Sequence, residues 1–295
     1  MAVTFCFFSK TTNSMFDARF VHLQMLKNIS RRALLQSPAL LAATAPIGLV
    51  LAPSAGYAQI TMLPDAIEKA EALFMLSQRA TKAYFAMGLG VRTQEAQKVL
   101  DASVQRFDRT LIELKAFAPT AASKKTYVDL GVAWVDLKIE LIGKAPSKSA
   151  SSKVITLNKT VFDLSGAGSN LFQEVAKTPI SKLQDVAGNV RMLSQRMTKN
   201  YFRRGWGVQA DAAEVEIQEA RKGYLQGKAF LLAAPQSTAA IKAQIEIANN
   251  QWTLIEAAVN STKPPSASNY SDVWAVSENI LSVMDGVCTA YFKQV

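Results

Sequence analysis

Histidine and cysteine are nearly absent from this 295-residue sequence, which has one His and two Cys. His22 and Cys6 both fall within residues 1–58, a stretch that we interpret below as an export signal. The other 237 of the 295 residues contain no histidine and one cysteine, Cys288. This composition excludes a Ser-His-Asp or Cys-His catalytic arrangement, a histidine-ligated zinc, a c-type haem and an internal disulfide. A glycine-rich phosphate loop and nucleic-acid-binding motifs are also missing, so we expect a non-enzymatic protein without cofactor, metal or nucleic-acid partner.

The N-terminal residues have the composition of an export signal. Arg31 and Arg32 precede an apolar run at residues 33–53, and the small residues 55–58 offer a cleavage point at their end. We interpret residues 1–58 as a twin-arginine-like signal, which predicts a periplasmic mature protein.

Two further features belong to this N-terminal interpretation. Residues 1–24 precede Met25 and are interpreted as an upstream extension, because a start at Met25 gives a signal of ordinary length. An alternative is an uncleaved helix that anchors the protein in the inner membrane, since about 20 apolar residues can span a bilayer. Three prolines in the apolar run argue against that alternative: Pro38, Pro46 and Pro53.

Charge is mildly unbalanced in the predicted mature chain. Residues 1–58 hold five of the 33 basic and one of the 23 acidic residues, which leaves 28 basic and 22 acidic residues. A net charge of this sign favours anionic small ligands, acidic partners or lipid headgroups.

The mature chain is a tandem repeat. Residues 75–91 (MLSQRATKAYFAMGLGV) and 192–208 (MLSQRMTKNYFRRGWGV) are identical at 12 of 17 positions, at a constant offset of 117. The correspondence continues to the C-terminus with small changes of offset: Trp134 pairs with Trp252, Gly166 with Gly286, and Phe172 with Phe292. We therefore divide the chain into repeat 1, residues 59–178, and repeat 2, residues 179–295.

Each repeat is predicted to form four helices. In repeat 2 an apolar stripe recurs at spacings of three and four, and Thr178-Pro179 supplies an N-cap followed by a proline at the first helical position. Pro235 ends a second helix, a third carries Trp252, and the last spans about residues 269–294. Alternating strand patterns are nearly absent. The predicted fold is all-α, with two tandem antiparallel four-helix bundles joined near residues 177–180.

Residues 187–199 (AGNVRMLSQRMTK) resemble the first helix of the PilJ/NarX-type periplasmic sensor domain, which occurs in type IV pilus chemotaxis transducers and in nitrate/nitrite sensor kinases. The resemblance covers about 20 residues of repeat 2 and is weaker in repeat 1. There Glu71 stands at the position of Gly188, and Phe74 stands at that of Arg191. It implies a sensory four-helix bundle that forms homodimers and binds nitrate or nitrite between its subunits. The residues after the motif lack a kinase or methylation region, so a membrane sensor or transducer is the expected partner.

The resemblance implies that Arg191 grips the anion and that Gly188 makes room for it. The residue types support this role, because a guanidinium presents paired planar donors that match planar oxyanions. Gln195 and Thr198 lie on the same strip of the helix and add donors without opposing charge. The alternative is a solvated arginine beside a bundle core. Four further cations are expected to be solvated or to face a partner: Arg79, Lys82, Arg196 and Lys199.

Two arrangements of the repeats remain open. If the bundles pair within one chain, Arg191 faces Phe74 and an anion is held by one arginine, which weakens binding by roughly 1.5–3 kcal/mol. If second repeats pair between chains, two Arg191 side chains converge on one anion per homodimer, and this is our hypothesis. A different class of function is a periplasmic interaction or scaffold module of a chemotaxis or pilus system that keeps the bundle without a ligand. Trp134, Trp252 and Cys288 are interpreted as buried packing residues.

Overall fold

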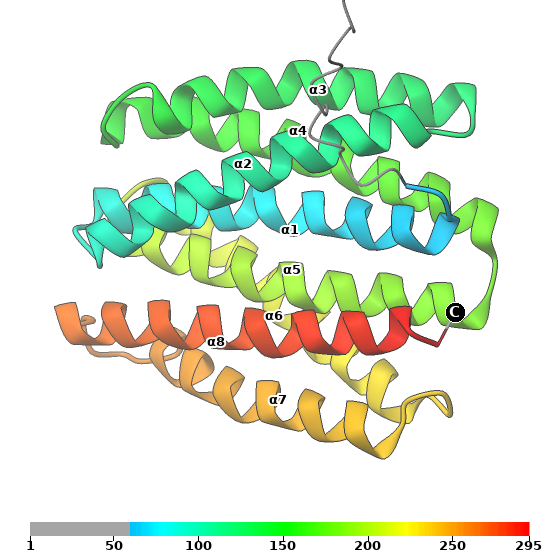
Figure 1. Cartoon of the computed structure of the whole chain (residues 1–295). Helices are drawn as coiled ribbons and strands as arrows, with labels where there is room; N and C mark the ends of the chain where they lie inside the picture. Colours follow the sequence, from blue (N-terminus) through cyan, green and yellow to red (C-terminus); the bar gives the residue numbers. More distant parts are fainter. Residues whose placement is uncertain (1–59, 295) are drawn as a thin grey trace, which may run out of the picture. The chain divides into compact units, whose positions relative to one another are not determined.

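The computed structural model describes residues 60–294, so the predicted signal at residues 1–58 lies outside the described residues. Within 60–294 there are eight α-helices and no strand, which confirms the predicted all-α fold (Figure 1). The first four helices are α1 (Leu63–Gly88), α2 (Thr93–Phe117), α3 (Ala121–Ile142) and α4 (Lys148–Ala176). The last four are α5 (Pro179–Gly205), α6 (Ala210–Ala233), α7 (Ala239–Val259) and α8 (Ala267–Phe292).

Each set of four helices closes on itself as a bundle. In repeat 1 the contacts run from α1 to α2, α2 to α3, α3 to α4 and α4 back to α1. The same cycle links α5, α6, α7 and α8 in repeat 2. Short loops reverse the chain between successive helices, as an up-down bundle requires.

The turn after the first helix has the same backbone geometry in both repeats. Gly90 and Gly207 both have a positive φ, of 80° and 73°. Two residues later Arg92 and Gln209 are also left-handed, with φ of 40° and 47°. The sequence repeat is therefore a structural repeat down to the backbone of this turn.

Local signals in the sequence set the helix ends. The Thr178 side chain accepts a hydrogen bond from the Ser181 amide, and the Ser181 hydroxyl accepts one from the Thr178 amide. This reciprocal capping satisfies amides that have no partner inside the helix. It fixes the start of α5 at Pro179, directly after the N-cap Thr178, as the Thr-Pro pair predicts.

The equivalent tryptophans of the two bundles, Trp134 and Trp252, are buried in the cores, as interpreted from the sequence. Trp134 is 1% exposed and stacks on Phe107 with ring centroids 3.7 Å apart. Trp252 is fully buried and stacks on Tyr224 at 3.6 Å. Cys288 is buried as well, and burial raises the pKa of its thiol to about 12, so it is not a reactive thiolate.

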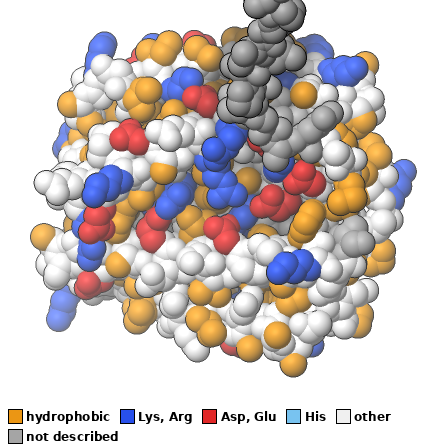
Figure 2. Space-filling view, viewed as in Figure 1, with side chains coloured by type: hydrophobic (Ala, Val, Ile, Leu, Met, Phe, Trp, Pro, Cys, Tyr) orange, Lys and Arg blue, Asp and Glu red, His pale blue; other side chains and the backbone are white. Residues whose placement is uncertain are grey.

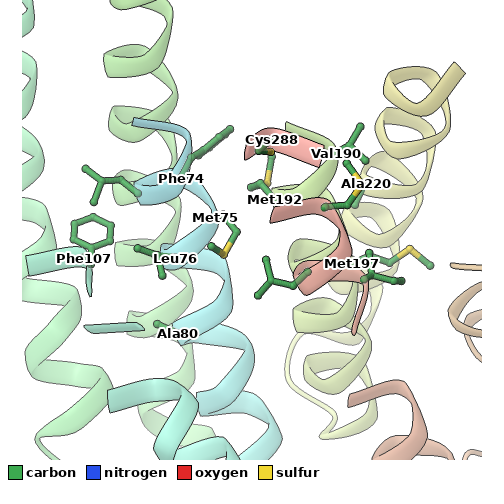
Figure 3. Close-up of a cluster of buried hydrophobic side chains, with 14 of the residues drawn as sticks. Phe74, Met75, Leu76, Ala80, Phe107, Val190, Met192, Met197, Ala220 and Cys288 are labelled. Atoms are coloured by element: carbon green, nitrogen blue, oxygen red, sulfur yellow. The ribbon is translucent and has the colours of Figure 1, made fainter. Parts of the chain in front are cut away.

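The two bundles belong to one compact unit because α1 packs along α5. In Figure 3, Phe107 and Leu76 lie on one side of α1, and Met75 lies on the other side, toward Met192 and Cys288. Additional contacts join α4 to α5 and α8 to α1, so each central helix is covered by its own bundle and by the other one. Among the described helices, none is long and apolar enough to cross a bilayer.

Candidate functional site

The segment that is most alike in the two repeats forms the polar centre of the contact between them. Four residue types recur at the offset of 117 and all are at most 6% exposed: Ser77/Ser194, Gln78/Gln195, Thr81/Thr198 and Lys82/Lys199. Buried polar side chains are costly unless they find hydrogen-bond partners. The serine and threonine side chains donate to carbonyls of their own helix, whereas Lys82, Gln195 and Lys199 make hydrogen bonds between the repeats.

Lys82 links repeat 1 to repeat 2. Its Nζ donates to Gln195 Oε1 at 2.7 Å, to Ser277 Oγ at 2.9 Å and to Glu278 Oε1 at 2.5 Å. Arg79 adds a two-point contact to the same Glu278 carboxylate, at 3.3 and 2.5 Å. We call this cluster of Arg79, Lys82, Gln195, Ser277 and Glu278 the Glu278 site.

The lysines at this interface correct one prediction. Lys82 is fully buried and Lys199 is 6% exposed, whereas both were expected to be solvated or to face a partner molecule. Arg79 and Arg196 are also largely covered, with 21% and 18% of their side chains exposed. The partner that these cations face is the other repeat or a neighbouring helix of the same chain. Burial lowers the pKa of Lys82 and of Lys199 to about 8, although nearby carboxylates oppose the shift.

Arg191 lies inside the molecule, on the side of α5 that faces α1 and α8. It is 1% exposed, and its Nη1 donates to Asp285 Oδ1 of α8 at 2.6 Å. Its Nε and Nη2 are buried and have no hydrogen-bond acceptor among residues 60–294. Two nitrogen donors of this buried guanidinium are therefore without a hydrogen bond, which is energetically costly.

Glu71 of α1 fills the space beside Gly188. A Cβ added to Gly188 would lie 2.6 Å from Glu71 Oε2 and 2.7 Å from Glu71 Cβ. A cavity of about 10 Å³ remains here, bordered by Glu71, Gly188 and Arg191 together with Glu68, Gln184 and Cys288. A volume of this size accommodates about one water molecule.

Burial makes Glu71 an unusual carboxylic acid. Removal from water and repulsion by Asp185 raise its pKa to about 8, and a hydrogen bond from Ser169 and the charge of Arg191 oppose the rise only in part. Its Oε2 has no partner among the described residues, and the same holds for both amide atoms of Gln184. Burial and the Asp185 charge thus favour the protonated form of Glu71, which can donate a hydrogen bond.

The structure brings only part of the predicted site together. Gly188 and Arg191 border the cavity, but the other two predicted residues do not. Gln195 takes part in the Glu278 site, and Thr198 Oγ1 donates to the Ser194 carbonyl at 3.0 Å. The cavity instead contains Gln184, which stands two helical turns before Arg191 on the same face and could have been found from that spacing.

The arrangement of the repeats corrects our hypothesis about the arginines. The α5 helix packs on α1 of the same chain, so Arg191 cannot meet a second Arg191 through this face. Phe74, which was expected to face Arg191 if the bundles pair within one chain, packs its ring on Phe162 of α4 at 4.4 Å, and Arg191 pairs with Asp285. Glu71 is the residue that lies against Gly188. A homodimer through another surface stays a prediction.

One face of the molecule is mixed in charge. Figure 2 shows basic and acidic side chains interspersed over the face on which α1, α2 and α8 lie. Within the described part of the chain, no group of three or more His, Cys, Asp or Glu side chains could hold a metal ion.

Comparisons with known proteins add no relatives: no protein-family model, no curated protein and no solved structure matches this chain.

Proposed function

We propose that the protein is a non-catalytic ligand-binding module that takes up a small planar oxyanion, such as nitrate or nitrite, at Arg191. The observation that carries this proposal is the pair of buried Arg191 donors, Nε and Nη2, which find no acceptor in residues 60–294. These two N–H groups form one edge of the guanidinium, and that edge matches two oxygens of a planar anion. The resemblance of residues 187–199 to PilJ/NarX-type sensor domains supports the same ligand class.

Glu71 determines whether an anion can enter. The cavity of about 10 Å³ is too small for nitrate until the Glu71 side chain leaves the space beside Gly188. With its pKa raised to about 8 by burial and by Asp185, Glu71 is neutral below that pH and does not repel the anion. Above it, the ionised carboxylate competes for Arg191. Binding should therefore weaken as the pH rises through about 8.

A single arginine limits the affinity. One chain supplies Arg191 but only Phe74 at the equivalent position of repeat 1. The loss of a second charged partner costs roughly 1.5–3 kcal/mol, or about one to two orders of magnitude in affinity.

The second candidate function is an interaction or scaffold module without a ligand. The observation that favours it is that Arg191 already has the Asp285 carboxylate at 2.6 Å, while Glu71 fills the space next to Gly188. In this case the internal acids have taken the place of the anion.

The proposal places this module in the periplasm. Its support is the signal-like composition of residues 1–58, including Arg31 and Arg32. A membrane sensor or transducer would then carry the signal onward. Fractionation of cells with an antibody to the mature chain tests the location, and a chain that begins near Gln59 is the expected product. Recovery of the uncut chain with membranes would support the anchored alternative.

Calorimetric titration with nitrate, nitrite and formate tests the ligand. We expect weak binding at pH 6 that declines by pH 9 and that Arg191→Gln abolishes. Asp285→Asn is the matched control, because it removes a competing carboxylate and keeps the arginine, so its affinity should rise. Equal heats for the parent and Arg191→Gln would leave the scaffold function as the better account.

A further inference from the structure

The interface between the repeats contains a second cluster that is the pseudo-symmetric counterpart of the Glu278 site. Lys82 of α1 corresponds to Lys199 of α5 at the offset of 117, and Gln78 of α1 corresponds to Gln195 of α5. The counterparts of Lys82 and Gln195 are therefore Lys199 and Gln78. On the fourth helix of each repeat the offset is 120, as the pair Gly166/Gly286 shows. At this offset Asn158 of α4 corresponds to Glu278 of α8. The carboxylate of one cluster is therefore an amide in the other.

The Glu278 site is filled by groups of the chain itself. The Lys82 ammonium donates to Gln195 Oε1 at 2.7 Å, and the Glu278 carboxylate contacts both Lys82 and Arg79. Burial would raise the pKa of Glu278, but Lys82 and Arg79 outweigh it and hold that pKa at about 2. An ammonium and a carboxylate thus lie side by side in a pocket that satisfies both.

The counterpart cluster borders a cavity. A cavity of about 280 Å³, which we call the Asn158 cavity, is bordered by α1, α4, α5 and α6. Lys199 Nζ donates to Asn158 Oδ1 at 3.1 Å, and α6 rather than α4 supplies the nearest carboxylate, Glu216 at 3.5 Å. A volume close to 300 Å³ is sufficient for a small organic molecule.

One residue that lines this cavity has a buried acceptor without a donor. Gln78 is fully buried, and its Oε1 has no hydrogen-bond partner within the structure as described for residues 60–294. The equivalent atom, Gln195 Oε1, accepts from the Lys82 ammonium. Lys199 does not donate to Gln78 Oε1, because its ammonium contacts Asn158 and Glu216 instead. An unpaired buried acceptor is costly, so a donor from a ligand is favoured at this position.

The cavity offers charges of both signs. Arg196 lies over the Phe162 ring at 5.0 Å and pairs with Glu219 at 3.0 Å, so a cation and an anion stand at the same wall. The ionisable residues that line the cavity balance in sign, with three cations and three anions: Lys159, Arg196 and Lys199, and Asp163, Glu216 and Glu219. Such a lining favours a ligand with no net charge that carries both signs.

We propose that the Asn158 cavity binds a free α-amino acid. Its carboxylate takes the place that Glu278 occupies in the counterpart, next to Lys199 and Arg196. Its ammonium donates to Gln78 Oε1 and faces Glu219. The ligand reproduces in one molecule the ammonium–carboxylate pair that Lys82 and Glu278 make in the Glu278 site. This site is separate from Arg191 and does not depend on the anion-binding proposal.

Calorimetric titration of the full chain with glycine, L-alanine, L-serine and L-aspartate tests the proposal. Propionate and ethylamine each carry one half of L-alanine and should bind at least tenfold more weakly than L-alanine. Propionate binding equal to that of L-alanine would overturn the claim of a zwitterionic ligand. An absence of heat with all four amino acids, together with no shift in melting temperature, would overturn the site itself.

Asn158→Glu is the decisive variant, because it places in the cavity the residue that the chain uses in the counterpart. We expect it to weaken amino-acid binding at least tenfold. Thr160→Glu adds the same charge at an exposed position of α4 and should leave binding unchanged. Unaltered binding by Asn158→Glu would contradict the proposal.

If Asn158→Glu fails to fold, Glu219→Gln on α6 provides a second test of amino-acid binding in the same cavity. Loss of this carboxylate should weaken L-alanine relative to propionate and so reduce the selectivity for an amino acid. Unchanged selectivity would contradict the assigned orientation. Nitrate titration of the same variants should match the parent, which separates this site from Arg191.

Discussion

Glu71 and Gly188 are equivalent positions of the two repeats, and they meet across the contact between α1 and α5. The Glu71 side chain comes so close that a Cβ on Gly188 would lie 2.7 Å from both its Cβ and its Cγ. One repeat therefore supplies the bulk and the other supplies the space. The interface between the repeats is therefore asymmetric at this position, where two identical subunits would have to carry the same residue twice.

Gly188→Ala should destabilise the protein. Alanine normally improves a helix interior over glycine by about 1 kcal/mol. Here the new methyl group would overlap atoms near the Glu71 backbone, and overpacking of this kind costs about 1–3 kcal/mol. Urea unfolding followed by circular dichroism measures the difference.

A control and a second substitution make this test specific. Gly286 is also in a helix interior, but its added Cβ would meet Gln244 only at ordinary distances of 3.4–3.8 Å. Gly286→Ala should therefore be neutral or stabilising. Combining Gly188→Ala with Glu71→Ala should recover part of the loss, and purely additive effects would show that the two side chains do not compete.

Glu71 should make stability depend on pH. Burial raises its pKa from 4.5 to about 8, so the folded state holds this proton more tightly than the unfolded chain. The stability that the proton contributes is complete below about pH 4.5 and is lost as the pH rises through about 8. As the pH rises from about 5 to about 8, the free energy of unfolding of Glu71→Gln should increase relative to that of the parent by an amount on the order of 2–4 kcal/mol.

Denaturant titrations of both proteins across this range provide the measurement. The lysines with pKa values near 8, Lys82 and Lys199, are present in both proteins and cancel in the difference. Parallel pH profiles of parent and variant would mean that Glu71 is ionised throughout.

The helices and the repeat could be predicted because their signals are local. Each signal involves residues that are close in sequence: the apolar spacing, the Thr178-Pro179 cap, and Gly90 and Gly207 in the turn after the first helix of each repeat. The burial of Lys82 and Lys199 could not be predicted in this way. A lysine beside an apolar stripe is solvated in a single bundle, and only the packing of a second bundle removes it from water.

The candidate site was predictable in part for the same reason. Gly188 and Arg191 share one helix face, so the sequence brings them together. Asp285 and Cys288 come from α8, and Glu71 comes from the other repeat. These contacts depend on how α1, α5 and α8 pack, which residue spacing does not specify.

Lys82→Met should be strongly destabilising. Lys82 is fully buried, and its removal takes one of two cations at 2.5 Å from the Glu278 carboxylate, 21% exposed, and leaves it paired with Arg79 alone. Breaking a largely buried ion pair from one side costs about 3–5 kcal/mol. Replacing both partners, as in Lys82→Met/Glu278→Met, should restore part of the stability, because the buried ammonium and its carboxylate are both removed and the charge that loses its partner, Arg79, is 21% exposed.

The exposed pair of Lys125 and Asp129 provides the matched control. Their side chains are 77% and 43% exposed, and such surface pairs contribute little. Lys125→Met should therefore leave thermal unfolding nearly unchanged. A Lys82→Met protein as stable as Lys125→Met would show that the link between the repeats does not depend on this lysine.

Repeat 2 without repeat 1 should behave differently from the whole chain. In the whole chain α1 covers the face of α5 that carries Gly188 and Arg191, and Arg191 is 1% exposed. A protein of residues 177–295 exposes that face, and two copies that pair through it bring two arginines together with two glycines between them. Like charges repel unless an anion lies between them, so nitrate should promote this dimer, whereas chloride, which lacks the planar shape, should do so far less. Sedimentation velocity in matched nitrate and chloride solutions measures the effect, and Arg191→Gln should remove it. The whole chain should sediment identically in both salts, because Glu71 and α1 already occupy the position of the second subunit. Identical sedimentation of repeat 2 in both salts would mean that paired arginines do not suffice for anion-linked assembly.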